Sequence, residues 1–310
     1  MTKDIAVLMG GWSAEREVSL VSGAAVSNAL KKLGHHVTTI DVGREIGTLL
    51  KALHPRVQVA FNALHGRFGE DGCIQGALEI IGLPYTHSGV LASALAMDKP
   101  TARRLFQAAG LRVAEGMVLS REQVLAGGFM DAPYVVKPFN EGSSVGVRIV
   151  QPGDNAKPFA DTAWPYGEQV LVERFIPGRE LTVAVMGDKA LGCLEIRPKQ
   201  GFYSYEAKYT DGKAEHLMPA PLSPAKYQEA LEIGLAAHRT LGCRGVSRTD
   251  LRYDDTKEGA NGDGGEFYVL EVNTQPGMTP LSLVPEIAAH AGISFEDLVS
   301  WIVEDASCPR

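Results

Sequence analysis

The chain has 310 residues, of which 45% are hydrophobic, and its formal net charge is −7. This length and apolar content suffice for a large buried core in two or three domains, and the acidic balance argues against a general nucleic-acid binder or a protein held on an anionic membrane. No apolar run approaches the roughly 20 residues of a membrane-spanning helix, and the first apolar run is too short for a signal peptide. The four scattered cysteines lack the spacing of a metal site and the density of a disulfide scaffold. We therefore expect a cytoplasmic protein.

The first hundred residues alternate between strand and helix patterns. A strand predicted at residues 5–9 leads into a glycine turn, and Ser13 is the predicted N-cap of a helix that ends at Gly34. The residues of this helix expected to face a core are Val18, Val21, Ala25 and Leu30. Strand, helix and strand patterns follow at residues 37–42, 45–53 and 57–62. The order predicts a βαβαβ unit with a parallel sheet.

Two side chains follow the ends of these strands, where open parallel sheets bind their ligands. Glu15 comes after the first strand and His65 after the third. Each also has an ordinary structural interpretation. Glu15 complements the dipole of the following helix, and His65 is a loop histidine with satisfied hydrogen bonds.

A helix and a hairpin are predicted next. The helix at residues 98–110 has a proline in its first turn. Lys99 lies at its start, where ordinary surface charge is a sufficient interpretation. Strands at residues 134–138 and 145–150 flank a small loop in which backbone N–H groups and serine hydroxyls can approach phosphate oxygens, with Lys137 as a nearby cation. Hairpin turns also use glycine and serine for geometry alone.

Strands are also expected at residues 169–178 and 180–186. Glu173 and Glu180 are suited to accept hydrogen bonds from an exocyclic amine and a ribose, although a polar rim on an ordinary strand pair has the same pattern. The aromatic segment 197–212 has no clear period, which indicates a lid or binding loop, or an excursion packed by its own aromatic rings.

The last predicted strand pair carries four polar side chains. Arg248 and Asp250 share one face of a strand at residues 243–253, and Glu271 and Asn273 share one face of a strand at residues 266–273. Two carboxylates and an amide carbonyl suit Mg²⁺, which prefers oxygen ligands and keeps water and substrate phosphates as the others. The alternative is the solvated outer face of an antiparallel sheet.

Seven motifs along the chain resemble those of the D-alanine–D-alanine ligases, a family of the ATP-grasp superfamily. They are residues 10–19 (GGWSAEREVS), 64–72 (LHGRFGEDG), 97–99 (MDK), 136–138 with 141–146 (VKP and EGSSVG), 205–209 (YEAKY), 248–250 (RTD) and 271–279 (EVNTQPGMT). The matches run in order over nearly the whole chain, so the series is far more specific than any one member.

The resemblance implies an α/β protein with the ATP-grasp fold. Its parts would be an N-terminal parallel-sheet (Rossmann-like) domain at residues 1–97, a central α+β lid domain at 98–182 and a C-terminal α+β domain at 183–310. It implies ATP-dependent ligation of two D-alanines through a D-alanyl phosphate, releasing ADP and phosphate, for peptidoglycan precursor synthesis. ATP, D-alanine and two Mg²⁺ or Mn²⁺ ions are the implied ligands, and a homodimer is the implied assembly.

The family roles that the matching motifs imply fall into three groups. The catalytic residues would be Glu15, His65, Ser143, Tyr209, Arg248 and Gly277, and the carboxylate of the second substrate would lie at Ser282 and Leu283. ATP would be bound by Lys99, Lys137, Glu173, Arg174, Phe175, Ile176, Glu180, Phe202 and Lys208. The metal ions would be held by Asp250, Glu271 and Asn273.

Alternatives within and outside the family stay open. Arg174 and Phe175 stand where many relatives have Lys and Trp, which makes the adenine contacts less secure than the metal ligands. Tyr209 goes with D-alanine as the second substrate, whereas relatives that form D-alanyl-D-lactate have a different lid. Another ATP-grasp carboxylate–amine ligase would lack the Glu15 motif, and a non-catalytic nucleotide sensor would have lost a metal ligand.

Overall fold

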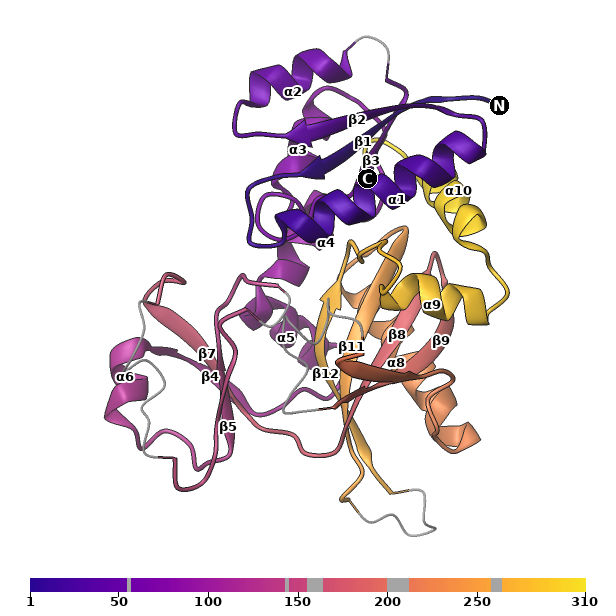
Figure 1. Ribbon diagram of the computed structural model, residues 1–310. Coiled ribbons are helices and arrows are strands. Elements are labelled where there is room, and N and C mark those ends of the chain that lie inside the picture. Colours follow the sequence, from indigo (N-terminus) through magenta and orange to yellow (C-terminus); the bar gives the residue numbers. More distant parts are fainter. Residues whose placement is uncertain (55–56, 143–144, 155–163, 200–211, 258–263) are drawn as a thin grey trace.

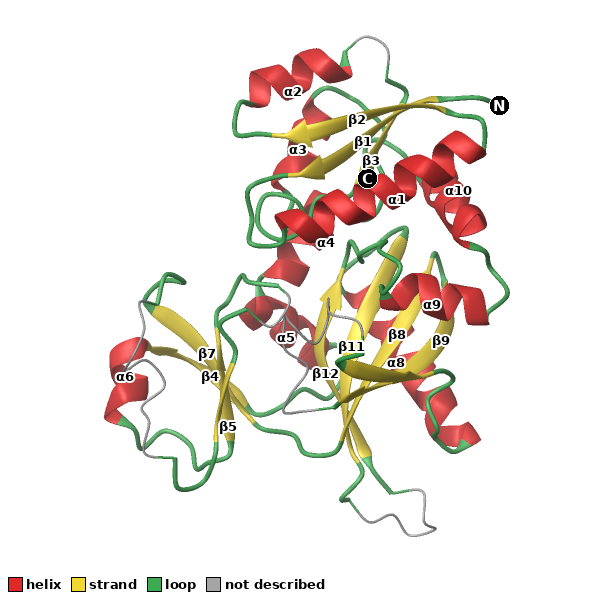
Figure 2. Cartoon of the chain, viewed as in Figure 1, coloured by secondary structure: helices red, strands yellow, loops and turns green. Residues whose placement is uncertain are grey.

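The computed structural model describes residues 1–54, 57–142, 145–154, 164–199, 212–257 and 264–310. The structure has three β-sheets with helices packed on them (Figures 1 and 2). One sheet belongs to residues 4–62, one to the middle of the chain and the largest to its last half. Two adjoining cavities, together called the cleft below, are lined by residues from all three parts of the chain.

The N-terminal sheet is parallel, as predicted, with the strand order β2-β1-β3. Its elements and the helices that follow are β1 (Asp4–Gly10), α1 (Arg16–Lys32), β2 (His36–Val42), α2 (Ile46–Leu53), β3 (Val59–Asn62), α3 (Cys73–Ile80) and α4 (Val90–Met97). The loops that follow β1 and β3 carry Glu15 and His65, which line a cavity together with Gly142 from the middle of the chain and Arg248 from the largest sheet.

The start and the buried face of α1 differ from the prediction. The helix begins at Arg16 after Glu15, and the hydroxyl of Ser13 donates to the His65 carbonyl oxygen at 2.7 Å instead of capping the helix. Val21 is 50% exposed, because the buried face consists largely of small residues. Ser19 and Ser22, both buried, use hydroxyls to satisfy backbone groups, so hydrophobicity alone did not locate this face.

The central sheet is antiparallel, with the order β4-β7-β5-β6. Its elements and the helix that precedes it are α5 (Lys99–Ala108), β4 (Gly116–Ser120), α6 (Arg121–Ala126), β5 (Tyr134–Lys137), β6 (Arg148–Val150) and β7 (Gln169–Arg174). The side chain of Asp98 caps α5 by accepting from the Thr101 N–H at 2.9 Å, which fixes where Lys99 leaves the helix.

The third sheet is antiparallel, with the order β10-β9-β8-β11-β12. Its strands and helices are β8 (Arg179–Met186), β9 (Lys189–Pro198), β10 (Ala214–Leu217), α8 (Pro224–Thr240), β11 (Val246–Asp254), β12 (Glu266–Asn273), α9 (Leu283–His290) and α10 (Phe295–Asp305). Helix α8 packs on β8, β9, β11 and β12. The side chains of β11 therefore alternate between a core under α8 and the cleft.

The end of the chain returns to the N-terminal sheet. Helix α10 packs on α1, and Tyr85 forms a β-bridge with Ser307. One hydrophobic core therefore runs from Ile5 on β1 to Val303 on α10. The division at residues 97 and 182 stays a prediction. Among the described helices, none is both long and apolar enough to cross a bilayer.

Candidate active site

Two adjoining cavities lie where the three sheets meet. The first is lined by residues that include Glu15, His65, Lys99, Arg248, Glu271, Asn273, Gly277, Ser282 and Leu283. The second is lined by residues that include Lys99, Lys137, Glu173, Arg174, Phe175, Ile176, Glu180, Asp250 and Glu271. Lys99 and Glu271 line both, so they stand at the junction.

The two strands that carry the expected metal ligands pair in the register that brings these ligands together. Asp250 is the direct partner of Glu271, and Arg248 is the direct partner of Asn273. The register shifts between Asp250 and Leu251, which leaves Leu270 as an extra residue on β12. This bulge lets the consecutive residues Leu270 and Glu271 both face the second cavity, which a regular strand does not allow.

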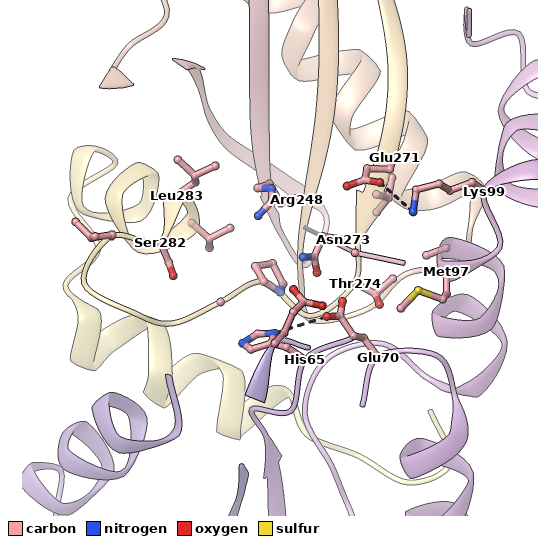
Figure 3. Close-up of a pocket in the computed structure, with 18 residues that line it drawn as sticks. His65, Glu70, Met97, Lys99, Arg248, Glu271, Asn273, Thr274, Ser282 and Leu283 are labelled. Atoms are coloured by element: carbon pink, nitrogen blue, oxygen red, sulfur yellow. Dashed lines mark ion pairs between the residues drawn. The ribbon is translucent and has the colours of Figure 1, made fainter. Parts of the chain in front are cut away.

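Basic side chains neutralise both carboxylates. The guanidinium of Arg248 donates two hydrogen bonds of 2.8 Å to the two oxygens of Asp250, and the hydroxyl of Thr182 donates to Asp250 at 2.7 Å. Lys99 Nζ lies 3.4 Å from Glu271 Oε2. Figure 3 marks this ion pair with a dashed line. Each negative charge therefore has a counter-charge within the protein.

The donor set fits a hard cation. No three His, Cys, Asp or Glu side chains form a metal-binding group within the described part of the chain. The expected set has only two carboxylates, and its third member is the Asn273 amide, whose Oδ1 accepts from the Gln275 N–H at 2.8 Å. Paired carboxylates with one amide oxygen suit Mg²⁺ or Mn²⁺, which take their remaining ligands from water and phosphate.

The second cavity is lined by two buried lysines, both expected to bind phosphate. Lys99 is 8% exposed, so the surface-charge interpretation is wrong, and its Nζ donates to the Glu141 carbonyl oxygen at 2.7 Å. Lys137 is 7% exposed and pairs with Glu173. Burial raises the pKa of Glu141, an effect that the positive charges of Lys99 and Arg67 oppose.

Arg103 is a buried residue that the sequence did not predict to lie near the site. It projects from α5, donates to the Ala114 carbonyl oxygen and pairs with Glu173, which is itself 3% exposed. Glu173 thus holds two buried cations, Arg103 and Lys137. Its partners come from an unrelated helix and a neighbouring strand, a combination that no local motif signals.

The segment expected to contact adenine follows β7. Arg174, Phe175 and Ile176 all line the second cavity, but the side chain of Arg174 is largely exposed and donates to Glu115 Oε2 at 2.8 Å. A second missed residue, Arg252, organises the segment. Its Nε donates to the Ile176 carbonyl oxygen at 3.1 Å, and its guanidinium carbon lies 5.7 Å from the centre of the Phe175 ring.

Arg252 also reaches beyond this segment. Its Nη2 donates to the Gly178 carbonyl oxygen at 2.8 Å, and Nη1 lies 3.6 Å from Glu180 Oε2. Burial lowers the pKa of Arg252, which the charge of Glu180 opposes. Arg252 lies two residues after Asp250 on β11, so the alternation of the strand places both side chains on the same face. That alternation could have identified Arg252 from the sequence.

The loop after β1 brings Glu15 to the opposite wall of the first cavity. Glu15 is 6% exposed. Its Oε2 would lie 2.7 Å from a Cβ built on Gly66 and 3.0 Å from a Cβ built on Gly142. Gly66 also has a φ of +70°, so both its conformation and its contact favour glycine. The Glu15 carboxylate therefore lies between the loop of His65 and the loop expected to cover phosphate.

His65 contacts two side chains. Its Nε2 lies 3.3 Å from Ser22 Oγ on α1, and its Nδ1 lies 3.7 Å from Glu70 Oε1. Figure 3 marks the pair of His65 and Glu70 with a dashed line. The Gly66 N–H donates to the same Glu70 oxygen at 2.6 Å. Glu70 is a third missed residue, and its place in the HGRFGEDG motif was the signal. A Cβ on Gly277 would lie 3.9 Å from His65 Nε2, so the two loops face each other closely.

Ser282 and Leu283 form the start of α9. The hydroxyl of Ser282 accepts from the Thr279 N–H at 2.9 Å, and a Cβ on Gly277 would lie 2.9 Å from it. Leu283 is buried. The structure thus brings together sixteen of the expected site residues, which line one or other of the two cavities. Ser143, Phe202, Lys208 and Tyr209 lie outside the described residues.

Comparison with known families decides which family the chain belongs to. The family model described as D-ala D-ala ligase C-terminus matches residues 105–304, and the one described as D-ala D-ala ligase N-terminus matches residues 45–88. The chain belongs to the D-alanine–D-alanine ligase family. The proteins named D-alanine–D-alanine ligase from Rhodospirillum rubrum and Methylocella silvestris are 58% and 59% identical to it, and the matches cover 99% and 100% of each chain.

Solved structures of the family confirm the fold. The D-alanine–D-alanine ligase of Bacillus anthracis complexed with ATP superimposes with a TM-score of 0.81 at 30% identity, over 98% of this chain and 97% of that one. A second structure of the Bacillus anthracis ligase has the same TM-score at 32% identity. The α/β ATP-grasp fold expected from the motifs is therefore confirmed.

Proposed function

We propose that this chain carries out the reaction of its family, the ATP-dependent ligation of two D-alanines to D-alanyl-D-alanine, at the junction of the two cavities. The observation that carries the proposal is the direct pairing of Asp250 with Glu271 at that junction, with Lys99 3.4 Å from Glu271. Relatives with this name match over the full length, and the Bacillus anthracis ligase has been crystallised with ATP. We infer that ATP occupies the second cavity and D-alanine the first.

The reaction has two chemical steps. A carboxylate oxygen of the first D-alanine attacks the γ-phosphorus of ATP, ADP leaves, and D-alanyl phosphate forms. The neutral amine of the second D-alanine then attacks the acyl carbon, and phosphate leaves as the peptide bond forms. The first step turns a carboxylate, a poor acylating agent, into a reactive one.

Lys99 and Lys137 are placed to neutralise phosphate charge in the first step. Both are buried, and in the described structure they pair with Glu271 and Glu173. An ammonium in a site of low dielectric stabilises a transferring phosphoryl group more strongly than in water. We propose that they turn toward the phosphates when ATP binds.

The metal ions would be held by Asp250, Glu271 and Asn273, whose oxygens suit Mg²⁺ or Mn²⁺. When bound, such ions supply positive charge at the phosphate oxygens. Arg248 already donates to both oxygens of Asp250 and thereby orients that carboxylate.

The first cavity would bind both amino acids. We propose that Glu15 accepts from the ammonium of the first D-alanine and that His65, held by Ser22 and Glu70, lies near its carboxylate. Arg248 and the Gly277 N–H would stabilise the oxyanion that develops when the amine attacks. Ser282 and the start of α9 would take the carboxylate of the second D-alanine.

The second cavity would bind adenosine. Phe175 and Ile176 offer apolar walls, and Glu180 would accept from the ribose hydroxyls. We also propose roles in closing the site for Ser143 and Tyr209 and in ATP binding for Phe202 and Lys208. These four rest on the motif resemblance alone.

Assembly, compartment and domain division are further proposals. Consumption of ATP supports a cytoplasmic enzyme. A homodimer is supported by the exposed Ile80 and Leu91 on α3 and α4, helices that pack against each other. The three-part division at residues 97 and 182 is supported by the separate N-terminal, central and C-terminal sheets.

The test is phosphate release with ATP and Mg²⁺ in the presence of D-alanine, L-alanine, or D-alanine with D-lactate, with products identified by mass. We expect release that depends on D-alanine and a D-alanyl-D-alanine product. A D-alanyl-D-lactate product, the alternative that the family membership does not favour, would keep the mechanism and change the second substrate. Release without D-alanine dependence would overturn the proposal.

A further inference from the structure

A buried pair of amide side chains joins the N-terminal sheet to the strand end that carries Asn273. Asn62 ends β3 and is 0% exposed, and Gln275 lies two residues beyond β12 and is 1% exposed. They are separated by 213 positions in the sequence. Gln275 is not among the residues that line either cavity.

Both ends of the Gln275 amide are satisfied across this junction. Its Oε1 accepts from Asn62 Nδ2 at 2.6 Å, and its Nε2 donates to the Leu64 carbonyl oxygen. Asn62 in turn donates to the Gly69 carbonyl oxygen at 2.9 Å, and its Oδ1 accepts from the Leu64 N–H at 3.2 Å. Such a network, in which each amide group has a partner, holds one arrangement of the chain strongly because any unpaired member would be buried.

The network lies directly behind the groups proposed to bind D-alanine. Leu64 precedes His65, and Gln275 is two residues before Gly277. The backbone N–H of Gln275 also donates to Asn273 Oδ1. One side chain therefore sets the spacing between two loops that come from different sheets and face each other across the first cavity.

We propose that Gln275 is a positioning residue that fixes His65 relative to Gly277, and so sets the affinity and turnover for D-alanine without touching it. The inference rests on the proposed function of the first cavity. It makes a selective prediction, because the second cavity depends on Lys137, Phe175 and Arg252, none of which bonds to Gln275 within the described structure. Loss of the Gln275 hydrogen bonds would therefore lower the affinity and turnover for D-alanine and leave the affinity for ATP unchanged.

A neighbouring glutamine provides a matched control. Gln75 is also 1% exposed, and its Nε2 donates to the same Gly69 carbonyl oxygen at 2.9 Å. It comes from α3 and has no described contact with the 273–278 segment. Its Oε1 has no hydrogen-bond partner in the described structure, whereas both ends of the Gln275 amide have one.

The experiment compares Gln275→Met with Gln75→Met in the full-length protein. Both changes keep side-chain length and remove the amide. We measure KM for D-alanine, KM for ATP and kcat, together with thermal unfolding. For Gln275→Met we expect kcat/KM for D-alanine to fall about tenfold, with KM for ATP within about twofold of the parent value. For Gln75→Met we expect KM for D-alanine, KM for ATP and kcat each to stay within about twofold of the parent value.

The inference is overturned if Gln275→Met leaves kcat/KM for D-alanine within twofold, if KM for ATP changes as much, or if Gln75→Met has the same effect. Should Gln275→Met fail to fold, Gln275→Glu supplies the same comparison, since it keeps the acceptor for Asn62 and loses the donor to Leu64. Activity of the parent chain is measured alongside. An inactive parent would refute the proposed function, whereas an active parent with an unaffected Gln275 variant would refute only this inference.

Discussion

Asp250 and Glu271 are direct partners on the antiparallel strands β11 and β12, and the bulge beside them turns Leu270 and Glu271 toward the same cavity. One strand end thus presents an apolar wall and a carboxylate in consecutive positions. A regular strand would have pointed one of the two into the core beneath α8. Glu271 therefore stands at the boundary between the first and the second cavity.

The substitution Glu271→Gln is expected to leave the fold intact and to lower kcat by about 100-fold or more, because it removes one of two carboxylates from the metal site. The Mg²⁺ concentration for half-maximal rate should rise as well. Glu266→Gln is the control, since Glu266 lies on the same strand and pairs with Arg112 outside both cavities. Equal kinetics of the Glu271 variant and the control would refute the metal assignment.

Arg252→Met is expected to raise KM for ATP by about tenfold and to change KM for D-alanine by less than twofold, because the guanidinium holds the backbone of Ile176 and Gly178. Arg112→Met is a close match. Arg112 also lies over an aromatic ring, Tyr268, at 5.7 Å and pairs with a glutamate, yet it lines neither cavity. Steady-state kinetics with ATP varied would contradict the assignment if both variants behaved alike.

Arg103→Met is expected to lower the free energy of unfolding by about 3 kcal/mol, because it leaves the buried Glu173 with one cation instead of two. Its neighbour Arg104 is exposed and bonds only to Thr101 among the described residues, so Arg104→Met should change stability by less than about 0.5 kcal/mol. Urea unfolding measures both. A change of similar size in the two variants would show that Arg103 is not part of a buried ion-pair network.

Stability should also fall in acid through His238. Burial lowers the pKa of His238 to about 4, and its Nδ1 lies 2.7 Å from Ser247 Oγ. The unfolded chain, with an ordinary pKa of 6.5, binds a proton below that pH that the folded chain does not bind until about pH 4. The contribution is therefore fully present above pH 6.5 and is lost as the pH falls to about 4.

The size of this loss is on the order of 3 kcal/mol. His238→Gln should flatten the decline of unfolding free energy between pH 6.5 and 4, measured by urea titration at each pH. His87, whose pKa burial lowers to about 3, acts in the same direction and retains part of the slope. An unchanged slope in the variant would contradict the account.

The sequence alone predicted most of the strands, although not β4, β9 and β10, and it identified motif residues that the structure brings to the two cavities. The alternation of β11 placed Arg248 and Asp250 on one face, and the pairing with β12 followed from the turn between them. What it did not show depends on contacts between distant segments. Arg103 meets Glu173 across 70 positions, and Arg252 meets Ile176 across 76.

One wrong prediction and one wrong alternative have specific causes. Hydrophobicity placed Val21 inside, whereas α1 buries serines whose hydroxyls bond to the backbone and to His65. Surface charge was an alternative interpretation of Lys99, because a lysine in a first helical turn is usually exposed. Its burial depends on Glu271 and on the Glu141 carbonyl oxygen, which come from other parts of the fold.

The most direct test of the central claim is to follow the carboxylate oxygens of D-alanine. The chain is incubated with ATP, Mg²⁺ and D-alanine labelled with ¹⁸O in its carboxylate, and the released phosphate is analysed by mass. If D-alanyl phosphate forms in the cleft at Glu271, the oxygen that bonds to phosphorus leaves with it when the amine attacks the acyl carbon, so each phosphate carries one ¹⁸O. Phosphate without ¹⁸O, accompanied by dipeptide, would contradict the acyl phosphate route.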